Sequence, residues 1–597
     1  MRYGLSGALI ALLMGWAGLT QAQQVTDAVA PEAPTARAAM ALSEDVIAAY
    51  GARDAGQPVE AQRWMVSAAN PLAVTAGAEV LRQGGSAADA MVAVQVMLGL
   101  VEPQSSGLGG GAFLIWYDAA SGELTTLDAR ETAPLAATPT LFQDENGEPL
   151  GFFDAVVGGR SVGAPGTPAL LAEVHRRWGR TPWPDLFEAG IAVAEEGFAV
   201  SPRLAGLVAR DAERLGRFAE TAAYFLPGGQ PVAEGAILRN PAYAATLRAL
   251  ANGGADAFYS GPIAADIVRT VTGAEGNPGM LSAIDLALYQ VRERPAVCAT
   301  YRVHEVCGMG PPSSGALTVG QILGMLDGYD LAALGPQSAE AWRLIGDASR
   351  LAFADRGRYM ADSDFVPMPT QGLVAPEYLA QRGALLAGGD ALPEVSPGTP
   401  DWDHAQLWAD DASIEFPSTS HISIVDGAGN VLSMTTTIEN AFGSRLLVRG
   451  FLLNNELTDF SFRTHRDGVP IANRLEPGKR PRSSMAPTIV MRDGAPVLAI
   501  GSPGGSRIIG YVAKTIIAWA DWGLNIQEAV SLPHAVNRFG TFDLEEGTGA
   551  ETLAPALEEL GYEVAVRALT SGLHAIEIGE GLKGAADPRR EGIALGE

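Results

Sequence analysis

The stretch Thr419-Ser420-His421-Ile422-Ser423-Ile424-Val425-Asp426 decides the fold of this chain. Polar and apolar residues alternate along it, which is typical of a β-strand. It begins with a hydroxyl side chain in the interior of a chain of 597 residues. If the chain were cut directly before Thr419, the new α-amino group could take the proton from the threonine's own hydroxyl. The function of the protein therefore depends on whether that cut is made.

The segments after Thr419 are predicted to be strands, whereas much of the chain before it is predicted to be helical. The pattern predicts hairpins at 419–425 with 431–437 and at 488–491 with 497–501, then a glycine turn and a helix over 508–522. Upstream it predicts helices over 69–100 with a break at Gly84-Gly85-Ser86, a hairpin at 112–117 with 123–128, and helices over most of 167–387. The polar segment 395–418 is expected to be an exposed linker.

Two glycine-rich loops, 105–111 and 502–507, allow more than one interpretation. Neither has the spacing and the Lys-Ser/Thr pair of a P-loop, and neither matches the dinucleotide-binding fingerprint. Turns that need a positive φ are the ordinary explanation for such glycines. Gly504 and Gly505 directly precede a predicted helix, so we favour a third explanation for them. Small residues there allow backbone N–H groups to approach an oxyanion.

Several motifs occur in an order that resembles the γ-glutamyltransferase family, from about Trp64 to the C-terminus. The central pair is Thr419-Ser420-His421-Ile422-Ser423 with Thr435-Thr436-Thr437-Ile438-Glu439-Asn440-Ala441-Phe442-Gly443. The other motifs that carry the resemblance are Ser106-Gly107-Leu108-Gly109-Gly110-Gly111, Asp128-Ala129-Arg130-Glu131-Thr132-Ala133-Pro134, Pro311-Pro312-Ser313-Ser314-Gly315, Leu453-Asn454-Asn455-Glu456-Leu457-Thr458-Asp459-Phe460, Lys479-Arg480-Pro481-Arg482-Ser483-Ser484-Met485, Gly501-Ser502-Pro503-Gly504-Gly505-Ser506-Arg507 and Asp587-Pro588-Arg589.

The resemblance implies the fold of an N-terminal-nucleophile hydrolase. This is a four-layer αββα sandwich, made as one precursor that cuts itself between Ser418 and Thr419. Residues 63–418 would form a large subunit and residues 419–597 a small, catalytic subunit. Both subunits would build one globule.

The resemblance also implies a reaction and the residues that carry it. Thr419 attacks the γ-glutamyl amide of glutathione or another γ-glutamyl compound and forms a γ-glutamyl-enzyme ester. Water, an amino acid or a dipeptide acceptor then resolves the ester. Thr437 is implied to hydrogen-bond to the nucleophile, and Gly504 and Gly505 to form the oxyanion hole. The residues implied to hold the glutamyl end are Arg130, Ser483 and Ser484 for the α-carboxylate and Glu439, Glu456 and Asp459 for the α-ammonium group.

This chain departs from the family pattern at a few positions. Glu439 stands where some members have asparagine. Ser420 replaces a threonine that many members have beside the nucleophile, but it remains a hydroxyl. The stretch 461–476 is shorter than the lid loop of some members and longer than in members without a lid. It therefore leaves the competition between water and other acceptors open.

The net charge limits the possible binding partners, and the N-terminal sequence indicates the cellular compartment. The formal net charge of −27 argues against nucleic acid and anionic membranes as partners. Residues 1–22 have the basic start, the apolar stretch and the small residues of a secretory signal peptide cut after Ala22. We therefore expect a periplasmic or secreted protein with no stable membrane insertion; an uncleaved anchor is the alternative. Residues 23–62 are expected to form a flexible mature N-terminus.

The cysteines and histidines suggest no metal centre. Cys298 and Cys307 fit a predicted hairpin, but a four-residue turn at 300–303 would place their sulfurs diagonally, so a disulfide is left open. The seven histidines are scattered along the chain without metal-ligand spacing. We therefore expect neither a metal nor another cofactor.

Two other functions remain open. A glutaryl or cephalosporin acylase of the same superfamily would remove a substrate acyl group that has no α-amino group. The paired carboxylates of Glu439 and Asp459 would then have no ammonium group to bind. An uncleaved, inactive binding relative would be exported in the same way. It would give a single band of full mature size on a denaturing gel.

Overall fold

Two seven-stranded sheets lie face to face in the centre of the molecule, and every strand pair within them is antiparallel. The computed structural model describes residues 43–404, 406–411, 413, 415–416 and 418–597. Sheet 1 has the order β23 (Ile593–Gly596), β2 (Met65–Ala68), β10 (Ser420–Val425), β11 (Val431–Thr437), β3 (Gly111–Tyr117), β4 (Leu124–Ala129) and β7 (Arg292–Arg294). Sheet 2 has the order β1 (Val59–Ala61), β22 (Leu582–Ala586), β21 (His574–Ile578), β17 (Ala495–Gly501), β16 (Thr488–Arg492), β9 (His304–Met309) and β8 (Ala296–Tyr301).

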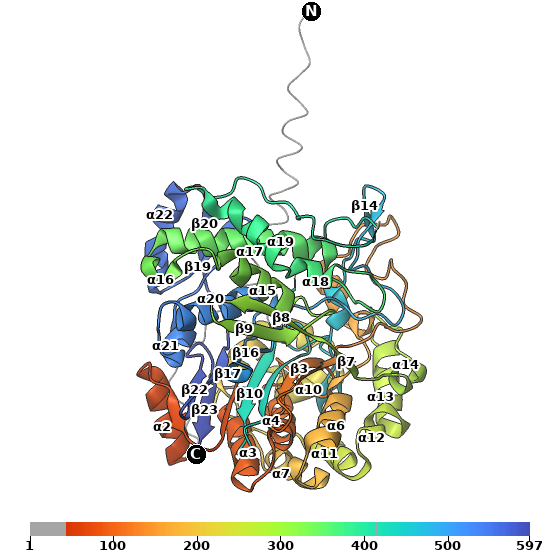
Figure 1. Ribbon diagram of the computed structural model, residues 1–597. Helices are drawn as coiled ribbons and strands as arrows, with labels where there is room; N and C mark the ends of the chain where they lie inside the picture. The colour runs from red at the N-terminus through yellow and green to blue at the C-terminus, as the bar shows by residue number, and fades with distance from the viewer. Residues whose placement is uncertain (1–42, 405, 412, 414, 417) are drawn as a thin grey trace, which may run out of the picture.

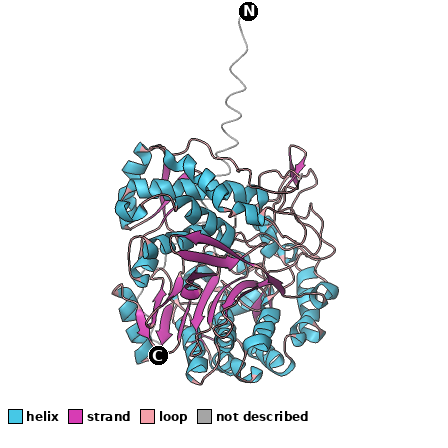
Figure 2. Cartoon of the chain, in the orientation of Figure 1, coloured by secondary structure: helices cyan, strands magenta, loops and turns pink. Residues whose placement is uncertain are grey.

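Helices cover the outer face of each sheet (Figure 1). Figure 2 shows the strands as a central band with helices above and below. The layer order is therefore helix, sheet, sheet, helix, as the resemblance implies. Helices that cover sheet 1 include α3 (Pro71–Arg82), α4 (Ala87–Val101), α6 (Thr167–Trp178), α7 (Glu188–Glu196), α8 (Pro202–Arg210), α11 (Pro241–Gly253) and α13 (Gly261–Thr272). Those that cover sheet 2 include α15 (Gly315–Leu326), α17 (Ala339–Tyr359), α20 (Ile508–Ala520), α21 (Ile526–Ser531) and α22 (Ala554–Glu559).

Strand β10 is buried on both faces because it lies inside the sandwich. Ile422 and Ile424 pack into the core that α3 and α4 share with sheet 1. Val425 packs into a smaller core between the two sheets. Alternate side chains point to opposite faces of a strand, so Thr419 shares the inner face with Val425. The residue at the head of β10 thus faces sheet 2 rather than solvent.

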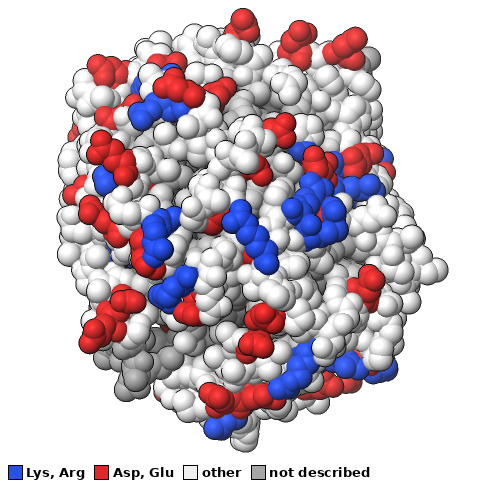
Figure 3. Space-filling view, turned by 60° about the horizontal axis from the view of Figure 1, so that its bottom comes forward, with Lys and Arg blue, Asp and Glu red and all other residues white. Residues whose placement is uncertain are grey.

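The predicted strands on both sides of Thr419 and the predicted helix break are confirmed. Gly84 and Gly85 separate α3 from α4, and Ser86 with Asp89 forms a capping box that starts α4. The hairpins β10–β11 and β16–β17 lie where the pattern placed them. The charge pattern is mixed: Figure 3 shows acidic and basic side chains interspersed over one face of the molecule.

Two predictions about irregular segments are wrong in part. Residues 44–54 form helix α2 (Glu44–Asp54), and β1 pairs with β22, so the end of the expected flexible N-terminus is ordered structure. The expected linker 395–418 is exposed over much of its middle, but Glu415, Phe416 and Ser418 are buried. Its last part therefore belongs to the interior. The predicted signal peptide, residues 1–22, lies outside the described residues. No helix of the described chain is long and apolar enough to cross a bilayer.

Cys298 and Cys307 form a disulfide across β8 and β9. The predicted diagonal placement is wrong. The turn contains only Arg302 and Val303, so the register pairs Tyr301 with His304 and sets the two cysteines directly opposite each other. Arg302 adopts φ 56°, the left-handed conformation that such tight hairpin turns need.

The disulfide predicts a specific labelling pattern. Iodoacetamide added to the denatured, unreduced protein should modify no cysteine, and prior reduction should expose both Cys298 and Cys307. Mass spectrometry of the peptides measures this directly. Two labelled cysteines without reduction would contradict the bond. The control is protein purified with reductant throughout.

Candidate active site

Thr419 and Thr437 meet because of the register between β10 and β11. Ser420 pairs with Thr436, so the residues one step further, Thr419 and Thr437, lie side by side at the end of the strands. Their hydroxyl oxygens are 3.2 Å apart. The Thr437 hydroxyl also lies 3.2 Å from the Ser418 carbonyl oxygen, to which it donates, and it accepts from the Glu439 backbone N–H at 2.8 Å.

The Ser418–Thr419 peptide bond is held on several sides. The Thr419 hydroxyl contacts the Ser418 carbonyl oxygen directly. The Ser418 hydroxyl donates to the Gln104 carbonyl oxygen at 2.8 Å, and Arg590 donates to the Thr419 carbonyl oxygen at 2.9 Å. Both residues of the bond are almost fully buried. The hydroxyl that the sequence singled out thus lies against the carbonyl group of the bond before it.

A small cavity of about 20 Å³ lies beside this bond, enough for about one water molecule. All the predicted site residues except Gly504 line it, so the structure brings residues from distant segments of the chain together. The lining residues are Arg130, Glu415, Phe416, Ser418, Thr419, Thr437, Glu439, Glu456, Asp459, Ser483, Ser484, Met485, Gly505 and Ile508. A space of this size is too small for an amino acid, and Glu415 and Phe416 are among the residues that bound it.

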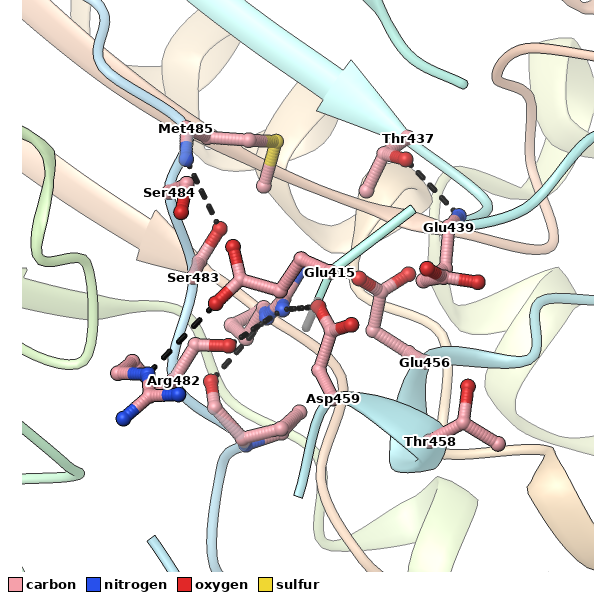
Figure 4. Close-up of polar contacts among 12 residues, drawn as sticks. Glu415, Thr437, Glu439, Glu456, Thr458, Asp459, Arg482, Ser483, Ser484 and Met485 are labelled. Carbon is pink, nitrogen blue, oxygen red and sulfur yellow. Dashed lines mark hydrogen bonds and ion pairs between the residues drawn. The ribbon is translucent and has the colours of Figure 1, made fainter. Parts of the chain in front are cut away.

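Arg130 is the buried cation of the site. Its guanidinium pairs with the carboxylates of Glu456 and Asp459 and donates to the Arg482 carbonyl oxygen at 2.9 Å. Figure 4 shows Glu439, Glu456 and Asp459 on one side of the site and Ser483, Ser484 and Arg482 on the other, with Glu415 between them. Carboxylates and cations therefore face each other across a buried site, an arrangement that suits a zwitterionic ligand.

Burial makes the carboxyl groups around Arg130 hard to ionise. Desolvation raises the pKa of Glu131 to about 8 and that of Glu439 to about 7, and it raises the pKa values of Glu456 and Asp459 well above the usual range. The positive charge of Arg130 opposes each of these shifts without cancelling them. Glu439, Glu456 and Asp459 line the cavity, and perturbed groups gathered in this way are typical of a functional site.

Glu439 is held in a strained position. Its φ is 75°, which is uncommon for a residue with a side chain. Its carboxylate accepts the backbone N–H of Phe416 at 3.2 Å and also contacts the Asn455 amide. The Glu439 carboxylate thus already accepts an N–H donor at the position where an ammonium group of a ligand is expected.

The serine pair and the glycine turn lie on the sheet 2 side of the site. Ser484 accepts from Arg356 at 2.8 Å, and Ser483 accepts from the Met485 backbone N–H at 3.1 Å. Gly505, with φ 58°, faces the backbone of Glu415 and Phe416 so closely that a side chain would collide with it. The next N–H of the turn, that of Ser506, donates to the Glu415 carbonyl oxygen at 3.3 Å.

Sequence reasoning missed part of the site. Glu415 and Phe416 line the cavity but were assigned to an exposed linker. An acidic residue just before the predicted cut was a usable signal. Arg356 lies on α17, and nothing in the helical pattern distinguishes it from a surface arginine. Among the described residues, no group of three or more His, Cys, Asp or Glu could hold a metal ion.

Comparison with known proteins agrees with this geometry. A family model described as gamma-glutamyltranspeptidase matches residues 73–597, and the chain belongs to that family. A glutathione hydrolase proenzyme of Bacillus subtilis (strain 168) is 36% identical over 89% of this chain and 91% of its own length. An acylase ACY 1 proenzyme of Pseudomonas sp. (strain V22) is 34% identical over 90% of this chain and 94% of its own. The crystal structure of a cephalosporin acylase from Bacillus halodurans superposes with a TM-score of 0.80 at 25% identity, covering 91% of this chain and 97% of that one.

The buried Glu439 carboxyl predicts a pH dependence of stability. Its folded pKa of about 7 exceeds the ordinary value of 4.5, because burial disfavours the charge. The folded chain therefore holds the proton more tightly, so the stability that this group contributes is complete below about pH 4.5 and is lost as the pH rises through 7. Relative to Glu439→Gln, the unmutated chain should lose up to about 3 kcal/mol of unfolding free energy between pH 4 and pH 8.

Urea unfolding at several pH values measures this difference. Both chains should carry Thr419→Ala, so that the same intact bond is present throughout. The exposed Glu559→Gln serves as the control substitution. Parallel stability curves for the chains with and without Glu439→Gln would show that the carboxyl does not titrate in this range.

Proposed function

We propose that this protein is a γ-glutamyltransferase and glutathione hydrolase that is made as a proenzyme and cuts itself between Ser418 and Thr419. The observation that carries the proposal is the Thr419 hydroxyl, which lies against the Ser418 carbonyl and beside the charged residues around Arg130. Membership of the family and the similarity to glutathione hydrolase proenzymes support it.

Self-cleavage would begin with attack of the Thr419 hydroxyl oxygen on the Ser418 carbonyl carbon. Thr437 donates to the carbonyl oxygen and supports the negative charge that develops there. The peptide C–N bond breaks, the Thr419 nitrogen takes a proton, and an ester links Ser418 to the threonine oxygen. Water then hydrolyses this ester. The products are a Ser418 carboxylate and a free Thr419 α-amino group.

The cut enzyme would use the same hydroxyl on a γ-glutamyl amide. The α-amino group has an ordinary pKa of about 7.7–8.0, so it is partly neutral at working pH and can accept the hydroxyl proton. The oxygen adds to the γ-carbonyl carbon, and the Gly504-Gly505 turn supports the oxyanion. The amine leaves with a proton, and water or an amino acid or dipeptide acceptor takes the glutamyl group from the ester.

Recognition of the glutamyl end favours this reaction over a glutaryl acylase. Arg130, Ser483 and Ser484 are the proposed partners of the α-carboxylate. Glu439, Glu456 and Asp459 are the proposed partners of the α-ammonium group, which a glutaryl side chain lacks. The contact between Glu439 and the Phe416 N–H supports this assignment, because it places an N–H donor on that carboxylate. The similarity to proteins described as acylases keeps the glutaryl reaction as the second candidate.

We also propose that the protein is exported. The signal-like residues 1–22 motivate this proposal, and the Cys298–Cys307 disulfide supports it, since such bonds persist in oxidising compartments.

Thr419→Ala should abolish both the cut and the activity. The variant lacks the attacking oxygen, so a denaturing gel should show one full-length band in place of fragments of roughly 40 and 20 kDa, at about 110 Da per residue. Ser420→Ala, which changes the neighbouring hydroxyl but not the nucleophile, is the matched control and should still be cut. Normal cutting of Thr419→Ala would assign the nucleophile to another residue. An uncut wild-type chain would favour the inactive binding relative.

The donor preference should separate the two candidate reactions. We expect turnover of L-γ-glutamyl-p-nitroanilide at least about a hundredfold faster, by kcat/KM, than glutaryl-p-nitroanilide, because the latter leaves the buried carboxylates unpaired. Release of p-nitroaniline measures both rates. Addition of a dipeptide acceptor then gives the share of transfer. Faster cleavage of the glutaryl compound would reverse the assignment.

A further inference from the structure

A second arginine, Arg356 on α17, reaches the site from behind the serine pair. It is 2% exposed and donates to the hydroxyls of Ser314 and Ser484, both at 2.8 Å. Its ion-pair partner is the carboxylate of Glu415, which lines the cavity. Only the Glu415 side chain therefore separates Arg356 from the cavity in which a donor would bind.

Arg482 adds a further positive charge on the same side. Its Nε lies 3.6 Å from the Glu415 carboxylate, beyond hydrogen-bond range, and its Nη2 pairs with Asp411 at 3.0 Å. Neither Nε nor Nη1 of Arg482 has a hydrogen-bond partner among the described residues, although the side chain is buried. Burial opposes ionisation of Glu415, yet the charges of Arg356 and Arg482 hold the pKa of its carboxyl below the ordinary value. The pocket around Glu415 is thus built for a carboxylate.

Glu415 and Phe416 both line the cavity. The Glu415 side chain presents a carboxylate next to Ser484, and the Phe416 N–H donates to Glu439. These two contacts come from adjacent residues of the chain. An acid on the serine side and an N–H on the Glu439 side are the two polar features of an α-amino acid. Glu415 and Phe416 therefore present the same two polar features as the α-amino acid end of a γ-glutamyl donor.

We propose that Arg356, supported by Arg482, adds to Arg130, Ser483 and Ser484 in binding the α-carboxylate of the donor in the cut enzyme, and that Glu415 fills this subsite in the uncut chain. The inference rests on the proposed γ-glutamyl reaction. A donor enters only if Glu415 and Phe416 leave, because the cavity beside them holds about one water. Departure of Glu415 removes the ion-pair partner of a buried guanidinium, which is strongly unfavourable unless another anion replaces it. The donor carboxylate is that anion.

The test removes Arg356 without leaving a buried charge in the uncut chain. Arg356→Met alone would strand the Glu415 carboxylate, so both variants carry Glu415→Gln. The reference is Glu415→Gln, and the test variant is Glu415→Gln with Arg356→Met. The donors are L-γ-glutamyl-p-nitroanilide and 4-aminobutanoyl-p-nitroanilide, which is the same donor without its α-carboxylate.

We expect the test variant to raise KM for the glutamyl donor at least about tenfold over the reference, which corresponds to one charged hydrogen bond. KM for the donor without the carboxylate should stay within about twofold of the reference, because that donor has no group for Arg356 to bind. Equal changes in KM for both donors would mean that Arg356 has only a structural role. No change in KM for either donor would mean that Arg356 does not contribute to donor binding. Arg358→Met is the matched control, since Arg358 is on the same helix but pairs with Asp410 near the surface.

A conservative variant covers the case in which the methionine variant is not cut. Arg356→Lys in the Glu415→Gln background keeps the charge and loses the planar fork, so it should raise KM for the glutamyl donor by an intermediate factor of about three to ten. An unchanged ratio of the two KM values would overturn the proposal. If the wild-type enzyme does not act on the γ-glutamyl anilide at all, the proposed function fails instead, whatever Arg356 does.

Discussion

The position of β10 in the middle of sheet 1 constrains the rest of the site. Strand β11 pairs with Ser420–Val425 on one side and β2 pairs with Ile422–Val425 on the other, so the pairing with β11 alone fixes where Thr419 enters the cavity. The same register brings Thr437 to Thr419. Because β2, β3 and β4 come from before the proposed cut while β10, β11 and β23 come from after it, hydrolysis of one bond would leave both pieces bound in a common sheet.

Charge is the second constraint. The site buries the guanidinium groups of Arg130, Arg356 and Arg482 among carboxylates that are themselves desolvated. Burial of an unpaired charge is unfavourable by several kcal/mol, so each group needs a partner in every state of the chain. In the uncut chain Glu415 and Asp411 supply partners on the serine side. Glu456 and Asp459 supply them to Arg130.

The sequence predicted what depends on local pattern and on motif order. Alternation located β10 and β11, glycines located the break before α4, and the order of motifs identified most of the residues that line the cavity. It could not predict pairings that depend on which turn closes a hairpin, as at Arg302 and Val303, where one turn length sets the cysteines opposite each other. It also placed Glu415 in solvent, because a polar, proline-containing segment is typical of a linker. Only the tertiary contacts with Arg356 reveal that this carboxylate is buried.

The location of Glu415 would link the proposed cut to access for the proposed donor. In the uncut chain, Glu415 and Phe416 are covalently joined to β10 on one side and to the upstream chain on the other. The Glu415 carboxylate is then an intramolecular ligand for Arg356. The proposed hydrolysis would release one end only, so Glu415 and Phe416 would stay attached to the large piece and remain competitors at an effective concentration on the order of millimolar. The proposed donor would therefore have to replace two contacts at once, the carboxylate at Arg356 and the N–H at Glu439. An α-amino acid end can do so, whereas a ligand with only one of these groups would leave the other buried partner without a counterpart.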